Sequence, residues 1–183
     1  MRAALVLGMV LFVSPIQINA EWAQEPSSYR GVQFGATRAT AMAALGNLNV
    51  CTVETGNGIL ACTDARSSFR LGEVPIKERL FFPNDLFVQV TLEFSSDHYA
   101  FVSSVFVEKF GKAHQTLKEP FQTKSGSTFE NEVMMWEGEG VIVMIKRLSG
   151  DVEHARANIS TKAFIEAEAR RAENNRKQAA ASF

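Results

Sequence analysis

The sequence predicts an exported α+β domain, in which an antiparallel sheet of several hairpins is packed by two helices and followed by a C-terminal helix. Three observations support this fold class. The chain begins with a stretch of secretory type, apolar and polar residues alternate on either side of short turns, and two apolar runs at helical spacing end at glycine. A helix followed by strands occurs twice, which predicts a degenerate tandem repeat.

Residues 1–20 have the pattern of a signal peptide. Arg2 precedes an apolar run, Pro15 breaks it, and Ala20 ends a small-residue cleavage site. We therefore expect a periplasmic or secreted protein. No later run reaches the about 20 apolar residues that a membrane-spanning helix needs, so we expect no integral membrane span.

Removal of the signal would leave three parts. We expect a flexible lead-in at 21–28, a single α+β domain at 29–160, and a C-terminal helix and tail at 161–183. The whole chain has 19 Lys and Arg against 20 Asp and Glu, so it lacks the strong positive field that nucleic acids attract. This balance argues against a nucleic-acid partner.

The first helix is predicted at 38–45. Thr37 can accept a hydrogen bond from a first-turn N–H, and Gly46 can take the left-handed conformation that ends a helix. Before it, residues 29–34 can add a short strand.

A tight hairpin is predicted around Gly56-Asn57-Gly58. A four-residue loop would place Cys51 directly opposite Cys62 at a non-hydrogen-bonded pair, where a cross-strand disulfide is feasible. The alternative is two buried free thiols, and export favours the disulfide.

This early part of the chain carries a family resemblance. The run 32–38, a helix ending in Leu45-Gly46, and two cysteines bracketing a hairpin resemble the first repeat of the secreted β-lactamase inhibitor protein family. The helix start and stop are also similar to small outer-membrane lipoproteins of the SmpA/BamE type. The resemblance covers 31–62 and implies a small exported α+β domain that binds proteins. No lipobox cysteine follows the signal, and no second cysteine pair occurs later in the chain.

The second hairpin turns at Pro83-Asn84-Asp85. Alternation from 86 to 94 predicts a half-buried strand, and a three-residue turn places Phe82 opposite Leu86. This register puts Phe81 beside Phe87 on the outer side, as a candidate partner-binding pair unless another segment covers them. It also points Glu78 inward, which we interpret as a position at the sheet edge in water or beside an arginine.

The second helix is predicted at 98–110, capped by the Ser95-Ser96-Asp97 run and ended by Gly111. Its broad apolar face should pack on the inner side of the preceding hairpin. Residues 112–127 follow as a polar connection.

A third hairpin, 129–137 with 140–148, is apolar on both faces. The expected register pairs Trp136 with Val141 and Met135 with Ile142. Such a hairpin either lies between two layers or offers a face to a partner, which makes Met135 and Trp136 partner-binding candidates. A last strand at 152–159 and a mostly solvated helix at 162–178 complete the chain.

The chemistry-bearing residues form no recognisable catalytic or metal-binding motif. The three histidines, His98, His114 and His154, are dispersed, and no nucleophile elbow, phosphate loop or dinucleotide fingerprint occurs. We therefore expect no metal or cofactor and no enzymatic activity.

Two hypotheses follow from the sequence. The first is a protein-binding module of the bacterial envelope or medium, in its sharper form an inhibitor of a secreted enzyme. The second is a small secreted hydrolase whose catalytic residues meet only in the fold. A pocket lined by a histidine and an acid would favour the hydrolase.

Overall fold

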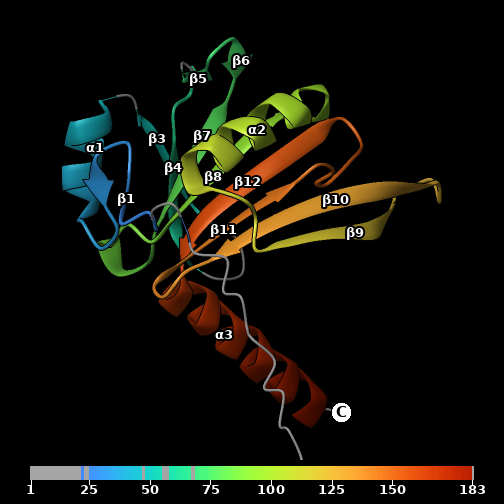
Figure 1. Cartoon of the computed structure of the whole chain (residues 1–183). Helices are drawn as coiled ribbons and strands as arrows, with labels where there is room; N and C mark the ends of the chain where they lie inside the picture. Colours follow the sequence, from blue (N-terminus) through green and yellow to red (C-terminus); the bar gives the residue numbers. More distant parts are fainter. Residues whose placement is uncertain (1–21, 23–24, 47, 55–57, 67–68, 183) are drawn as a thin grey trace, which may run out of the picture.

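The computed structural model describes residues 22, 25–46, 48–54, 58–66 and 69–182. The predicted signal peptide and the tip of the first hairpin, residues 55–57, lie outside the described residues. The described chain forms an α+β fold built on one eight-stranded antiparallel sheet, with three α-helices among the described residues (Figure 1).

The sheet runs without a break from one edge strand to the other. Its strands, in order across the sheet, are β3 (Val50–Val53), β4 (Leu60–Thr63), β7 (Lys77–Phe82), β8 (Gln89–Ser95), β12 (His154–Thr161), β11 (Val141–Lys146), β10 (Thr128–Glu137) and β9 (Gln115–Gln122). Two small hairpins lie outside it, β1 (Ser28–Tyr29) with β2 (Val32–Gln33) and β5 (Arg70–Leu71) with β6 (Val74–Pro75).

The topology contains the predicted repeat. Helix α1 (Arg38–Leu45) is followed by β3, β4, β7 and β8, and helix α2 (Tyr99–Phe110) is followed by β9 to β12. The last strands of the two halves, β8 and β12, pair with each other at the centre of the sheet. Each half thus extends outward from this central pair to its own edge.

The helix ends follow from local capping. Thr37 Oγ1 accepts a hydrogen bond from the Thr40 N–H at 3.3 Å, and Gly46, at φ 69°, donates its N–H to Met42 O at 2.9 Å. Ahead of α2, the Ser95 side chain accepts from the Asp97 N–H in a short 3₁₀ turn. These caps confirm the predicted start and end of the first helix and the predicted cap of the second.

The core lies between the sheet and α2. One row of side chains crosses the inner face from the edge strand β3 to β10: Cys51, Cys62, Leu80, Val90, Ile159, Val143 and Trp136. Trp136 is fully buried, with its ring 6.2 Å from the rings of Phe106 and Phe110, and its Nε1 donates to Gly111 O at 2.9 Å. Burial of this row and of the apolar side of α2 in one core removes apolar surface from water and stabilises the fold.

The predicted disulfide is confirmed. Cys51 and Cys62 are bonded, with their Cα atoms 4.0 Å apart. The Glu54 N–H donates to Ile59 O at 2.8 Å, which closes a four-residue loop and leaves the cysteines at a non-hydrogen-bonded pair. The bond links the edge strand β3 covalently to β4.

Two predicted registers are wrong by two residues. In the second hairpin, Leu80 pairs with Val90 instead of the expected Val88. In the third hairpin, Trp136 pairs with Val143 instead of Val141. Since side chains alternate with a period of two, this shift preserves the predicted faces of the residues that remain paired. In the second hairpin the cause is a wider connection, because the 3₁₀ turn Pro83–Asp85 is followed by residues that leave the ladder.

The predicted polar connection at 112–127 is also wrong. It contains β9, which pairs with β10 along its whole length and forms an edge of the sheet. Its exposed, largely polar residues and Pro120 gave no strand pattern, as is common for an edge strand.

Helix α3 (Lys162–Ala181) begins directly after β12 and runs away from the sheet (Figure 1). Thr161 Oγ1 caps it by accepting from the Phe164 N–H. It has no buried residue, and ion pairs one turn apart, such as Lys177 with Glu173 at 2.7 Å, support it. Among the described helices, none is long and apolar enough to cross a membrane.

Candidate binding surface on the open face of the sheet

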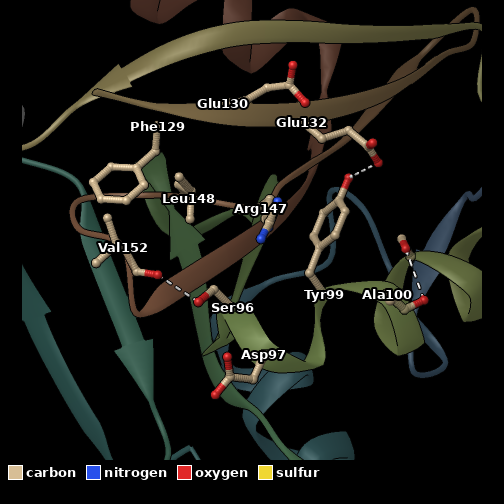
Figure 2. A pocket seen from close by; sticks show the side chains of 11 residues that line it. Ser96, Asp97, Tyr99, Ala100, Phe129, Glu130, Glu132, Arg147, Leu148 and Val152 are labelled. Atoms are coloured by element: carbon tan, nitrogen blue, oxygen red, sulfur yellow. Dashed lines mark hydrogen bonds between the residues drawn. The ribbon is translucent and has the colours of Figure 1, made fainter. Parts of the chain in front are cut away.

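A first candidate site is a cavity at the end of the sheet, between the start of α2 and β10 (Figure 2). Its volume is about 830 Å³, and Asp97, Glu130, Glu132 and Arg147 bring charges to it. Tyr99 Oη donates to Glu132 Oε1 at 3.0 Å. Burial, reinforced by the Glu132 carboxylate, raises the pKa of Tyr99 well above its usual range. Tyr99 therefore acts here as a hydrogen-bond donor at neutral pH.

The outer face of the sheet is a second candidate surface. In the described part of the chain, α1 and α2 contribute their buried side chains to the core on the inner face, and α3 leads away from the sheet (Figure 1). We call the outward-facing side chains of the main strands the open face. Its two longest rows are Val50, Thr63, Arg79, Thr91, Asn158, Met144, Met135 and Gln115, and next to it Lys77, Glu93, Arg156, Lys146, Val133 and Leu117.

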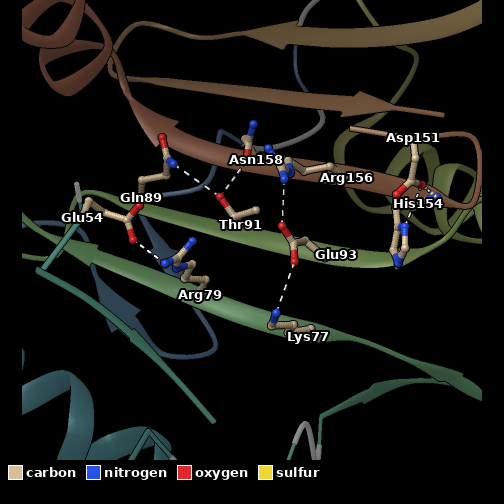
Figure 3. Close-up of polar contacts among 10 residues, drawn as sticks. All are labelled: Glu54, Lys77, Arg79, Gln89, Thr91, Glu93, Asp151, His154, Arg156 and Asn158. Carbon is tan, nitrogen blue, oxygen red and sulfur yellow. Dashed lines mark hydrogen bonds and ion pairs between the residues drawn. The ribbon is translucent and has the colours of Figure 1, made fainter. Parts of the chain in front are cut away.

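Neutral polar groups occupy the centre of the open face (Figure 3). Thr91 Oγ1 donates to Asn158 Oδ1 at 2.8 Å and accepts from Gln89 Nε2 at 3.4 Å. Ser160 Oγ donates to Gln89 Oε1 at 2.6 Å. These bonds join β8 and β12, so the two halves of the chain are cross-linked by side chains as well as by backbone.

Charges beside this centre are paired within the protein. Glu93 accepts from Arg156 at 2.8 Å and lies 3.7 Å from the Lys77 ammonium, while Arg79 forms an ion pair with Glu54 (Figure 3). Such partly exposed pairs add little stability. They do leave the surface with nearly balanced charge.

The other half of the open face carries an apolar patch beside polar and charged residues such as Gln115 and Lys146. Met135 and Met144 are directly opposite each other on β10 and β11, and Leu117 on β9 is 50% exposed. Methionine is unbranched and polarizable, so it adapts to the shape of a binding partner. The open face therefore combines an apolar patch with a hydrogen-bonding centre.

The structure divides the predicted partner-binding residues into two groups. Phe81 and Met135 are half-buried and lie on the open face. Phe87 and Trp136 are fully buried, so the candidate pair of Phe81 and Phe87 does not form, and the alternative that another segment covers Phe87 applies. Phe87 leaves the ladder, its N–H donates to Ala36 O at 2.8 Å, and its ring stacks on Phe34 with centroids 5.0 Å apart.

The Glu78 side chain lies on the inner face of the sheet and is 2% exposed. Its carboxylate accepts two hydrogen bonds from Arg30, at 2.8 and 2.9 Å, and one from Tyr29 Oη. Burial first, and then the adjacent Glu78 charge, raise the pKa of Tyr29. The predicted arginine partner is present, but the predicted position at a sheet edge is wrong, because β7 lies between β4 and β8 and the Glu78 side chain is buried.

A histidine and an acid meet on the surface turn after β11. His154 Nδ1 lies 2.7 Å from Asp151 Oδ1, and this hydrogen bond raises the pKa of His154 and lowers that of Asp151. His154 pairs across β12 and β8 with Ser95, and both line a shallow cavity of about 430 Å³. Sequence spacing could not reveal this cluster, since 56 positions separate Ser95 from Asp151.

No group of three or more His, Cys, Asp or Glu side chains in the described ranges is placed to hold a metal ion. No protein-family model, curated protein or solved structure matches the chain.

Proposed function

We propose that this protein is a non-enzymatic, exported binding module that takes a protein partner on the open face of its sheet. The observation that carries the proposal is a broad sheet face without a covering helix in the described chain, with methionines at one end and hydrogen-bonding groups at its centre. Protein interfaces combine an apolar core with polar groups in this way.

Two further observations support export and a protein partner. The Cys51–Cys62 disulfide is typical of an oxidising compartment outside the cytoplasm. The predicted signal peptide agrees with that location, and the resemblance of 31–62 to the β-lactamase inhibitor family implies a partner that is itself a protein.

The test compares two variants with matched chemistry. Leu117→Ser with Met135→Thr alters the open face, whereas Phe101→Ser with Val107→Ser alters exposed apolar residues of α2. The immobilised exported protein is used to capture a partner from an envelope extract, and affinity is then measured with the purified partner. We expect the open-face variant to weaken the dissociation constant at least tenfold, or about 1.4 kcal/mol, and the α2 variant to leave it within about twofold. Equal binding by the open-face variant would refute the proposed surface.

The sharper form of the proposal is inhibition of a secreted enzyme. It rests on the resemblance alone and is tested by titrating the protein into secreted β-lactamases and other secreted hydrolases. Stoichiometric inhibition that the open-face variant loses would support it, and full enzyme activity at micromolar protein would refute it.

A second candidate function is favoured by one observation. Ser95, His154 and Asp151 are the residue types of a hydrolytic triad, and His154 is already oriented by Asp151. Among the described contacts Ser95 and His154 share no hydrogen bond, and Ser95 instead accepts from the Asp97 N–H. Hydrolysis of an activated ester that falls to background in both Ser95→Ala and His154→Gln would favour the hydrolase over the binding module.

A further inference from the structure

A small apolar cavity lies on the inner side of the sheet, away from the open face. It has a volume of about 150 Å³, is partly open at its rim and is bordered by α2, the β1 strand and the segment before β5. Its apolar walls come from Tyr29, Phe69, Leu92, Val105, Phe106 and Phe110.

The volume restricts what can enter. A cavity of about 150 Å³ lined by Leu, Ile and Phe side chains stays free of water and accepts benzene, whereas drug-sized ligands need about 300 Å³ or more. The cavity therefore fits one aromatic ring.

Two cationic side chains border this cavity, and they differ in how they are held. Arg30 is fixed by the two hydrogen bonds to the buried Glu78 carboxylate, and its guanidinium carbon lies 4.5 Å above the Phe69 ring centre. Its charge is thereby matched by Glu78. Lys109 lies with its ammonium 5.5 Å from the Phe110 ring centre, and within the described part of the chain no carboxylate pairs with it.

The rim of the cavity consequently carries one net positive charge beside an aromatic-sized apolar space. We propose that this cavity binds a small aromatic carboxylate, with the ring between α2 and Tyr29 and the carboxylate at the Lys109 ammonium. The binding energy of the ring comes from apolar burial, and the ion pair selects acids over neutral aromatic compounds.

The test uses three probes with the full exported protein: phenylacetate, benzene as a ring without charge, and acetate as a charge without a ring. Methyl resonances of Val105, Leu92 and Ile159 report on the cavity in NMR titrations. We expect phenylacetate to shift them with a dissociation constant of about 1 mM or lower, benzene to bind more weakly, and acetate to have no effect. Absence of any shift with both phenylacetate and benzene would overturn the proposal.

Two variants separate the ring from the charge. Val105→Phe fills the cavity and should abolish both binding events, with circular dichroism used to verify its fold. Lys109→Gln should weaken phenylacetate binding about five- to tenfold and leave benzene binding unchanged, while the control Lys112→Gln, an exposed residue outside the cavity, should change neither. Unchanged phenylacetate binding in Lys109→Gln would overturn the assignment of the carboxylate.

Discussion

The Glu25 carboxylate accepts a 2.7 Å hydrogen bond from the backbone N–H of Gly140, which ties the N-terminal segment to the turn between β10 and β11. The same carboxylate accepts from the N–H groups of Glu139, at 2.9 Å, and Val141, at 2.7 Å. A Cβ atom added at Gly138 would overlap the Glu25 carboxylate. One side chain thus satisfies three backbone donors of a turn.

Glu25→Gln should lower the free energy of unfolding by about 1 kcal/mol at pH 7, because charge-assisted bonds from a partly exposed group are lost. Partial burial disfavours the Glu25 charge, but the three N–H donors and Lys162 outweigh it, so its pKa is lowered. The contribution is therefore complete above the unfolded pKa of about 4.3 and disappears as the pH falls through the lower folded value. Urea unfolding at pH 7 and near pH 3 measures it. Glu139→Gln is the control, and an equal loss in that variant would contradict the assignment.

Reduction of the Cys51–Cys62 bond should lower the free energy of unfolding by about 2–3 kcal/mol, since 11 positions separate the cysteines and the loop that they close is short. Denaturant unfolding of the oxidised protein and of Cys51→Ala with Cys62→Ala measures the difference. Titration of two free thiols in the native, unreduced protein would contradict the bond itself.

Phe87→Ala and Phe81→Ala should differ strongly in their effect on stability. Phe87 is fully buried, and its truncation should cost about 3–5 kcal/mol. Phe81 is half-buried on the open face, so about 1 kcal/mol is expected. Equal losses of stability in the two variants would contradict the burial of Phe87 after the turn Pro83–Asp85.

Glu78→Ala should destabilise the fold by about 3 kcal/mol, because it leaves Arg30 without the carboxylate that it binds. Tyr29→Phe removes a single hydrogen bond to the same carboxylate and should cost about 1 kcal/mol. Thermal unfolding of both variants ranks them, and the reverse order would show that the ion pair is dispensable.

The sequence revealed the local structure of this fold better than its long-range contacts. Caps at Thr37 and Gly46 and the alternation around Val90 depend on neighbouring residues, so the helices and the faces of the hairpins could be predicted. The registers could not, because turn width depends on residues such as Phe87 that bond to a distant segment.

The candidate site could be predicted only in part, because it too depends on contacts between residues that are distant in the sequence. Met135 was identified from the apolar pattern of its strand, whereas Trp136 has an equally apolar pattern and lies on the opposite face, under α2. Pairing of Glu78 with Arg30, and of His154 with Ser95 across two strands, brings together residues 48 and 59 positions apart. Spacing along a chain carries no signal for such pairs.

The central position of β8 and β12 has a consequence for how the chain is made. β8 has one neighbour, β7, that precedes it in the chain, whereas its other neighbour, β12 (His154–Thr161), belongs to the second half of the sheet and is synthesised much later. Pairings between such distant segments form slowly, so we expect the two halves of the sheet to join only after β12 has been synthesised. Late joining of the two halves is compatible with the proposed export, because a chain crosses an export channel before its sheet has formed.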